Sequence, residues 1–378
     1  MPRKTNTTIN NNDYYRVTAT IGKAADGKPI RKQFYGSNKK EAEAKRDEYI
    51  ANIKQGLAIN YDKALFSVAF KAWLDNVLRP SVALSSYRRY EVDYRLRIRD
   101  CGLASMRLTD IRAANIQALY SELLVDYTPN TIWNTDKLLR HFFNYAVKSD
   151  LIIKSPMLAV ELPADKSVKP EKHILGRDEA QRLIDEAREN PDAVIFAFAV
   201  LSGLRQGEIL ALKHSDIDFK AGKIHVNKTV DFLTIDGSFK PLVTVPKTQA
   251  SIRTVPIMDA LKPLLSTHIR REKEKHFKEC TPWTLDSILF SSAKCTYIEG
   301  GNIRKRLKRL LKKLGIEPTS FHALRHSFCT LLAEQGVPLK TASMLMGHSS
   351  ISITAKYYTH VDDAEKRRGI EKLSNAFI

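Results

Sequence analysis

The chain has 378 residues, and its 61 Lys and Arg residues against 42 Asp and Glu residues give a formal net charge of +19. Apolar residues make up 43% of the chain, which is enough for packed cores and excludes a wholly disordered protein. No apolar run approaches the ~18 residues of a membrane-spanning helix. The four cysteines form no Cys-x-x-Cys pair, so we expect neither a zinc site nor a disulfide framework, and no cofactor. The length indicates roughly two or three domains. The strong net positive charge predicts nucleic acid as the partner.

The first 60 residues open on a polar tip, expected to be disordered, and then predict a small three-stranded sheet followed by a helix. In residues 14–22 apolar and polar side chains alternate, as in a half-buried strand. A further strand is predicted over residues 30–36, after an Asp-Gly turn. The helix is predicted to begin near Asn38, with Ser37 or Asn38 itself as its cap.

This first segment is also strongly basic. It holds 12 Lys and Arg residues against 6 Asp and Glu residues, a balance of 12 − 6 = +6. Strands with a basic, threonine-rich outer face fit a groove of duplex DNA, although a merely solvated sheet face has the same pattern. We expect the DNA contacts to include Arg16, Thr18, Arg31 and Lys32.

Residues 64–165 predict an all-helical domain. Apolar residues recur at helical spacing in four segments, residues 65–78, 84–100, 107–124 and 128–150. The first helix is expected to stop at Pro80, the second to be capped by Ser85, and the third to be capped by Thr109. The second helix carries Arg88 and Arg89, which we expect to contact the DNA backbone.

The remaining chain predicts a mixed domain in which helices dominate. Residues 163–173 are charged, contain two prolines and lack apolar periodicity, which indicates a linker. Helices are predicted over residues 176–187 and 193–204, strands over residues 223–230 and 241–257, and helices again from Met258. The fold class expected is therefore multi-domain α+β: a small N-terminal sheet plus helix, an all-α bundle, and a mainly helical domain with a small β-sheet.

Residues 302–315 predict an amphipathic helix with one strongly basic face. Leucines form its apolar stripe, and the opposite face carries a run of Lys and Arg that includes Arg304 and Arg306. Such a face is either solvated or in contact with a nucleic-acid backbone, and we favour the backbone contact.

Arg205 and Glu208 interrupt an apolar stretch, LSGLRQGEILAL, in which Ser202-Gly203 indicates a break between two helices. A guanidinium among leucines needs a partner, because an unpaired buried charge is costly. The sequence allows two interpretations: an ion pair between residues three apart, or a clamp on a phosphate with Glu208 holding the helix.

In the segment FHALRHSF, His322 and Arg325 lie three residues apart on a predicted helix and so share a face. Two rigid donors at this spacing suit the oxygens of one phosphate. The segment contains no carboxylate, which argues against a metal site. His348 follows Gly347 and adds a group of the same type, although a capping or core histidine is the simpler interpretation.

In their order, these motifs resemble the tyrosine recombinase (phage integrase) family. The shared features are an Arg in a Gly-Leu-Arg-x-Gly-Glu setting, a hairpin Lys, a His-x-Leu-Arg-His helix, a Gly-His turn and a Tyr-Thr-His tyrosine, and they span residues 170–360. By this resemblance residues 1–60 look like an arm-type DNA-binding domain, residues 64–165 like a core-binding (SAM-like) domain, and residues 170–378 like the catalytic domain. Within this family the chain looks most like an integrase of a bacteriophage or of an integrative conjugative element.

The resemblance implies a catalytic site composed of Arg205, Lys247, His322, Arg325, His348 and Tyr358. Tyr358 would be the nucleophile, the two arginines would clamp the scissile phosphate, Lys247 would be the general acid, and the histidines would complete the pocket. For two of these roles, a second residue of the same type lies nearby in the sequence. Tyr358 is preferred to Tyr357 because it heads Tyr-Thr-His, and Lys247 is preferred to Lys240 because it stands in a Pro-Lys-Thr context.

The implied function is site-specific recombination. The enzyme would cleave and rejoin duplex DNA through a 3′-phosphotyrosyl intermediate, and so integrate and excise a mobile genetic element without ATP; no GxxxxGK[ST] motif is present in the sequence. The alternatives are a DNA-binding protein that keeps the fold without strand transfer, and a type IB topoisomerase-like enzyme.

The partners expected are duplex DNA at core and arm attachment sites, a homotetramer in synapsis, and accessory DNA-bending or excision factors, with no membrane. The polar first dozen residues lack the apolar stretch of a secretory signal. We therefore expect the protein in the cytoplasm of a bacterial host, associated with the nucleoid.

Overall fold

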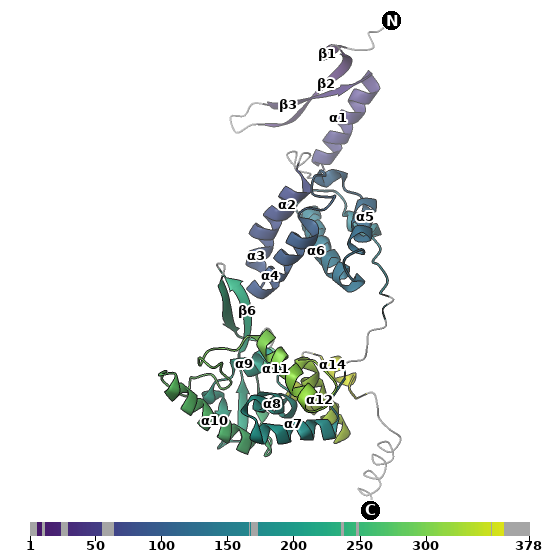
Figure 1. Cartoon of the computed structure of the whole chain (residues 1–378). Helices are drawn as coiled ribbons and strands as arrows, with labels where there is room; N and C mark the ends of the chain where they lie inside the picture. Colours follow the sequence, from purple (N-terminus) through teal and green to yellow (C-terminus); the bar gives the residue numbers. More distant parts are fainter. Residues whose placement is uncertain are drawn as a thin grey trace, which may run out of the picture. The chain divides into compact units, whose positions relative to one another are not determined.

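The computed structural model describes residues 6–9, 12–23, 29–54, 64–165, 167, 173–235, 238–246, 249–348 and 350–358 (Figure 1). The chain divides into two compact units, residues 1–168 and residues 169–378. Helices dominate the described residues and are accompanied by small antiparallel sheets, so the predicted mixed α+β class is confirmed. Within the described part of the chain, no helix is both long and apolar enough to cross a membrane.

The first unit begins with a three-stranded antiparallel sheet in the order β1 (Thr7–Ile9), β2 (Asn12–Lys23) and β3 (Pro29–Gly36). The expectation of disorder in the polar tip was wrong for β1. There the side chain of Asn6 donates to the carbonyl of Arg16 at 2.9 Å and extends the pairing of β1 with β2. The expected alternation in β2 is confirmed, since exposed and half-buried side chains alternate over residues 16–20.

Helix α1 (Lys39–Lys54) packs against β2 and β3 (Figure 1). Asn38 Oδ1 accepts a hydrogen bond from the N–H of Glu41 at 3.0 Å, so Asn38 is a side-chain cap of this helix. Buried Phe34 of β3 lies 5.1 Å from the Tyr49 ring, measured between centroids, and anchors the helix on the sheet.

The rest of the first unit is helical, as predicted. It consists of α2 (Phe66–Trp73), the π-helical turn η1 (Leu74–Leu78), α3 (Arg79–Ser81), α4 (Leu84–Asp93), the π-helical turn η2 (Tyr94–Ile98), η3 (Leu108–Asp110), α5 (Ala113–Leu123), α6 (Pro129–Lys148) and η4 (Pro156–Ala159). Aromatic rings contribute to its core. The centroid of the Phe70 ring lies 5.3 Å from that of Trp73 and 4.7 Å from that of Phe142. The buried residues of α6 follow the apolar stripe expected from the sequence.

Three predicted helix boundaries in this part were wrong. The first helix continues through Pro80 to Ser81, because Pro80 follows the π-helical turn η1 and stands in the first turn of α3, where its missing N–H costs no hydrogen bond. Ser85 lies inside α4, since Ala83 is the N-cap and its carbonyl accepts from the N–H groups of Ser86 and Tyr87. Thr109 lies in the 3₁₀ turn η3, and α5 begins only after it.

The second unit is built around the apolar helix α8 (Val194–Ser202), whose residues from Val194 to Val200 are all buried. Helices α7 (Arg177–Glu189), α10 (Leu261–Lys278) and α12 (Phe321–Glu334) pack against it. The other helical elements are η5 (Pro191–Ala193), α9 (Gln206–Ala211), η6 (His214–Asp216), η7 (Gln249–Ser251), α11 (Gly300–Lys313), α13 (Leu339–Met346) and α14 (Ile351–Ala355).

Two small sheets lie beside these helices. The first has the order β4 (Ile217–Asp218), β5 (Lys223–Val226) and β8 (Arg253–Pro256), and the second is the hairpin of β6 (Thr229–Ile235) and β7 (Ser238–Thr244). The segment over residues 241–257, predicted to form β-structure, thus contributes to two different sheets, through β7 and β8. The amphipathic helix predicted over residues 302–315 is present as α11, with its leucine stripe buried.

Two glycines with positive φ bring the helix ends together. Gly203 ends α8 with φ +64, and a Cβ there would lie 2.2 Å from a ring atom of Phe328 on α12. Gly347 ends α13, also with φ +64. Only glycine adopts this conformation without strain, so these two positions allow the ends of α8 and α13 to lie close to Arg325 of α12.

Candidate active site

The end of α13 is held by three arginines from three separate parts of the second unit. Three consecutive main-chain carbonyls at this helix end each accept a hydrogen bond from a different guanidinium group. The pairs are Arg253 Nε with Leu345 (2.8 Å), Arg325 Nη2 with Met346 (2.6 Å) and Arg205 Nη2 with Gly347 (2.8 Å). The partial negative charge of a helix C-terminus stabilises cations there. We call these three arginines, together with Glu208, the arginine cluster.

Glu208 balances part of the positive charge of the cluster. Its buried carboxylate binds Arg205 Nη1 at 2.8 Å and Arg253 Nη2 at 2.9 Å. Burial opposes its ionisation, but the hydrogen bond and charge of Arg253, followed by the hydrogen bonds from Arg205, hold the pKa of Glu208 below its usual value. The ion pair of Arg205 with Glu208 is therefore present. The Arg205 side chain nevertheless keeps 36% of its surface exposed, so a bound phosphate can reach it.

Arg325 is almost completely enclosed, with 1% of its surface exposed. It lies on α12, and its Nη1 donates to the carbonyl of Gly203 at 2.8 Å, just after the end of α8. Burial, followed by the positive charge of Arg205, lowers the pKa of Arg325 to about 9, which leaves the guanidinium charged at pH 7. Arg205 and Arg325 therefore lie in one region, joined through adjacent carbonyls.

His348 lies directly after Gly347 and so enters the same region. Its Nδ1 is 2.7 Å from Thr354 Oγ1 on α14. Burial, followed by the positive charges of Arg325 and Arg205, lowers the pKa of His348 to about 4, so this imidazole is neutral at pH 7. His348 is thus a neutral proton donor or acceptor within a cationic setting.

His322 belongs to the first turn of α12, one turn before Arg325. Its side chain is exposed whereas that of Arg325 is buried, so the helix presents the two groups at different depths. The His322 ring lies 4.4 Å from the ring of His326.

The two neighbouring tyrosines follow α14 and have different partners. Tyr358 Oη donates to the main-chain carbonyl of Val337 at 2.9 Å. Tyr357 Oη lies 3.0 Å from His326 Nε2, and burial raises the pKa of Tyr357. Both rings pack against the small apolar group of Phe328, Cys329 and Met346. The hydroxyl of Tyr358 is thus engaged with the main chain in this structure.

The two candidate lysines fall in the segment before β8. Lys247 lies outside the described residues. Lys240 belongs to β7, where it pairs across the hairpin with Leu233 of β6. The described residues thus bring Arg205, Arg325 and His348 together, with His322 at the surface of the same helix as Arg325.

Comparison with known proteins identifies the family to which the chain belongs. The sequence model described as the phage integrase family matches residues 173–365, which include every residue of the arginine cluster. A tyrosine recombinase XerC-like protein of Caldanaerobacter subterraneus subsp. tengcongensis is 36% identical, with 100% of both chains covered. The chain belongs to the phage integrase family. It is a tyrosine-type site-specific recombinase, as the sequence predicted.

Two further similarities extend over most of the recombinase. The integrase of Staphylococcus phage L54a is 26% identical, over 85% of this chain and 98% of that protein. The solved structure of the Tn1549 transposon integrase, in complex with a circular intermediate DNA, superposes with a TM-score of 0.67 at 23% identity. That superposition covers 81% of this chain and 98% of the integrase, and it shows the shared fold.

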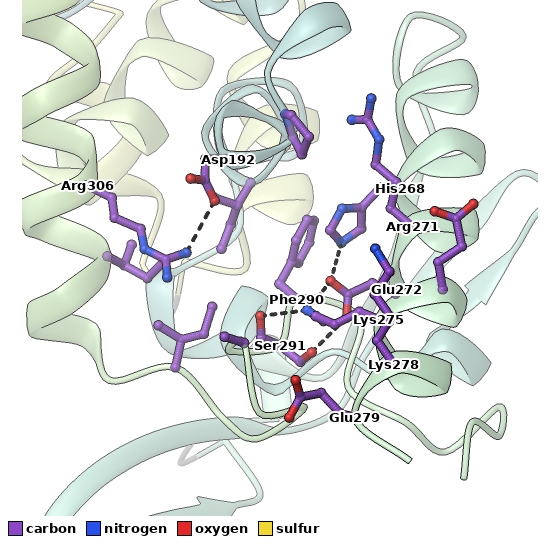
Figure 2. Close-up of a pocket in the computed structure, with 16 residues that line it drawn as sticks. Asp192, His268, Arg271, Glu272, Lys275, Lys278, Glu279, Phe290, Ser291 and Arg306 are labelled. Carbon is purple, nitrogen blue, oxygen red and sulfur yellow. Dashed lines mark hydrogen bonds and ion pairs between the residues drawn. The ribbon is translucent and has the colours of Figure 1, made fainter. Parts of the chain in front are cut away.

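A separate pocket of about 530 Å³ in the recombinase is lined by α10, η5, α11 and the loop around Phe290 (Figure 2). Its lining includes no residue of the arginine cluster. Two of its cations have carboxylate partners: Lys275 Nζ lies 2.6 Å from Glu272, and Arg306 lies 3.6 Å from Asp192 (Figure 2). Because the lining shares no residue with the arginine cluster, we do not assign this pocket to strand transfer.

The residues of the first unit that we expect to contact DNA lie in its N-terminal sheet and in its helical part. Arg16 and Thr18 are exposed on the polar face of β2. Arg31 and Lys32 lie in β3, and their side chains are outside the described residues. On α4, Arg88 forms an ion pair with Glu91 at 2.8 Å, and the guanidinium of Arg89 lies over the ring of Tyr90, 5.2 Å from its centroid.

The two contacts expected on α11 differ in their surroundings. Arg304 is exposed, whereas Arg306 is half-buried and paired with Asp192. Arg304 is therefore the freer of the two to meet a DNA backbone.

The sequence analysis did not include Arg253 among the candidate site residues. The available signal was an arginine at the start of an apolar strand, in the segment Arg-Thr-Val-Pro-Ile. Its importance appears only when Glu208 and Leu345, 45 and 92 residues away in the sequence, are seen as its partners.

Proposed function

We propose that this recombinase cuts and rejoins duplex DNA at specific attachment sites through a covalent 3′-phosphotyrosyl intermediate on Tyr358. The observation that carries the proposal is the arginine cluster, in which the partly exposed side chain of Arg205 lies near buried Arg325 and neutral His348. Negative charge builds up on the equatorial oxygens of a phosphate during phosphoryl transfer, and fixed cations stabilise it. A buried Arg held by main-chain carbonyls needs little reorganisation when that charge develops.

The cleavage step assigns one role to each predicted residue. Tyr358 Oη attacks the phosphorus, the bond from phosphorus to the 5′-oxygen breaks, and the phosphate remains attached to the tyrosine. His322 accepts the tyrosine proton, and Lys247 gives a proton to the leaving 5′-oxygen. His348 donates a hydrogen bond to a phosphate oxygen, which it can do while neutral.

The joining step reverses this chemistry with a different strand. A 5′-hydroxyl attacks the phosphotyrosine, the bond from phosphorus to Tyr358 Oη breaks, and the tyrosine regains its proton. One phosphodiester bond is lost and one is formed, so no ATP is required. In this structure the hydroxyl of Tyr358 donates to Val337, and we infer that it leaves this carbonyl before it attacks.

Exchange between two duplexes breaks four strands, and each chain supplies one Tyr358. We therefore propose a homotetramer on paired core sites, assembled by residues 64–165 and 170–378. We assign residues 1–60 to arm sites, with Arg16 and Thr18 on the exposed face of β2 as contacts. Accessory DNA-bending or excision factors would choose between integration and excision of a mobile element, acting on nucleoid DNA in the bacterial cytoplasm.

A nicked suicide substrate tests the chemistry. Because of the nick, the short fragment that carries the new 5′-hydroxyl dissociates after cleavage, so the covalent intermediate accumulates and survives denaturation. We expect the wild-type protein to form this adduct and Tyr358→Phe to form none. Absence of an adduct from the wild type, or its survival in Tyr358→Phe, would overturn the proposal and favour a DNA-binding protein without strand transfer.

Relaxation of a supercoiled plasmid separates the recombinase from a type IB topoisomerase-like enzyme. We expect recombination between two attachment sites, with relaxation only on plasmids that carry such a site. Relaxation of any plasmid at equal rates, with no recombinant product, would instead support the topoisomerase-like activity.

A further inference from the structure

The buried carboxylate of Glu208 is shared by two arginines of different exposure. Arg205 keeps 36% of its side chain exposed, whereas Arg253 keeps 7% and Glu208 keeps 2%. A bound phosphodiester can therefore meet Arg205, but Arg253 is enclosed by protein. Any influence of Arg253 on the reaction has to pass through the groups that it contacts.

All three nitrogens of the Arg253 guanidinium donate hydrogen bonds to other groups of the protein. Nη2 and Nη1 bind the two oxygens of Glu208 at 2.9 and 3.2 Å, Nη1 also donates to the carbonyl of Ser251 at 3.1 Å, and Nε donates to that of Leu345 at 2.8 Å. The two bonds to Glu208 form the planar bidentate pair that only an arginine provides. Arg253 thus links the start of β8 to α9 and to the end of α13.

The charges of this group explain why a second arginine matters. Arg205 and Glu208 alone would sum to zero, so little charge would remain for a phosphate. With Arg253 included, two positive charges face one negative charge, and the sum is +1. Because Arg253 makes two contacts with Glu208 and is the larger influence on its pKa, it takes up the carboxylate and leaves the charge of Arg205 available.

Arg253 also packs against the turn that carries His348. A Cβ on Gly347 would lie 2.8 Å from Arg253 Nη1 and 3.0 Å from the carbonyl of Ala250. The guanidinium therefore fills the space directly beside the main chain that positions His348. A shorter or uncharged side chain would leave this turn without the contact and Leu345 without its donor.

We propose that Arg253 is a positioning residue for strand transfer: it neutralises Glu208 so that Arg205 keeps its charge for the phosphate, and it fixes the turn that carries His348. The inference rests on the proposed function, because it assigns Arg205 and His348 to the phosphate. It predicts that Arg253 acts on the rate of cleavage and not on the affinity for DNA.

The test measures single-turnover cleavage of the suicide substrate and, separately, the Kd for the same DNA. We expect Arg253→Gln to reduce the cleavage rate by about 10²-fold, the effect of a small displacement of catalytic groups, with Kd within about twofold of the wild type. Arg253→Lys keeps the charge but loses the bidentate geometry, and should recover part of the rate. Adding Glu208→Gln to Arg253→Gln removes the carboxylate that competes for Arg205, and should also recover part of the rate.

Lys275→Gln is the matched control in the same unit. It removes the cation beside another buried carboxylate, that of Glu272, outside the arginine cluster (Figure 2). Melting temperatures identify variants that have lost their fold, and Lys275→Gln should cleave at the wild-type rate. Cleavage by Arg253→Gln at the wild-type rate, or equal rate losses in Arg253→Gln and Lys275→Gln, would overturn the inference. Failure of the wild type to form an adduct would instead overturn the proposed function.

Discussion

The hydroxyl of Tyr358 donates to the main-chain carbonyl of Val337 at 2.9 Å, while that of its neighbour Tyr357 lies 3.0 Å from His326 Nε2. The first bond engages only a main-chain group, whereas the second joins two side chains whose rings also stack, with centroids 4.5 Å apart. We therefore expect Tyr358 to leave its partner more readily than Tyr357 does.

Tyr357→Phe tests the choice of nucleophile. This variant keeps the ring stack on His326 and loses one side-chain hydrogen bond, typically worth about 1 kcal/mol of unfolding free energy. We expect it to form the covalent adduct with the suicide substrate, with only a small decrease in melting temperature. Peptide mapping of the adduct should place the DNA on Tyr358. Loss of the adduct in Tyr357→Phe, with the fold intact, would assign the nucleophile to Tyr357 instead.

Gly347→Ala should impair both stability and cleavage. Gly347 has φ +64, which costs an L-residue roughly 1–2 kcal/mol, and the added methyl group would also collide with Arg253 Nη1. Gly222→Ala is the control, because Gly222 has φ +65 but a Cβ there meets no atom within 4 Å. We expect both variants to unfold at lower urea concentration, Gly347→Ala more so, and only Gly347→Ala to lose cleavage. Equal unfolding midpoints would contradict a packed turn.

His214 should make stability depend on pH. It is buried against the ring of Trp283, and burial, followed by the charge of His268, lowers its pKa to about 4 from an ordinary 6.5. The folded state therefore binds fewer protons than the unfolded state, and the unfolding free energy falls as the pH drops from about 6.5 toward 4. We expect urea midpoints of His214→Phe to fall less over this range than those of the wild type.

The exposed His225 provides the control for that measurement. The variant His225→Gln should retain the full pH dependence of the wild type. If His214→Phe and the wild type lose stability in parallel between pH 6.5 and 4, the buried histidine is not the cause.

Arg304 and Arg306 should differ in their contribution to DNA binding. The net charge of +19 predicts affinity that falls steeply with salt, with a slope near −0.9 per phosphate contact on duplex DNA. Arg304 is exposed on α11, whereas Arg306 is already paired with Asp192. We expect Arg304→Gln to reduce the slope of log Kd against log salt by about 0.9, and Arg306→Gln to change it much less. The opposite order would show that the pair with Asp192 opens on DNA.

The sequence by itself determined the order of the helical and β segments and the residue types of the candidate site. Local periodicity was sufficient for α8 and α11, because an apolar run or a leucine stripe at helical spacing has one way to be buried. The positive φ of Gly347 agrees with the turn expected before His348. The order of the motifs also indicated the family, because it does not depend on how the segments meet in space.

The tertiary structure decided which groups lie together and how their charges are balanced. Arg205, Arg253 and Arg325 come from distant segments and meet only because α13 ends between α12 and β8. No local pattern links Arg253 to Glu208 or to Leu345, since helix and strand periodicities carry no information on contacts 45 or 92 residues away. The helix boundary wrongly predicted at Pro80 and the hydrogen bond of Tyr358 to Val337 could not be predicted for the same reason. Each depends on the positions of main-chain groups, which are set only when the chain folds.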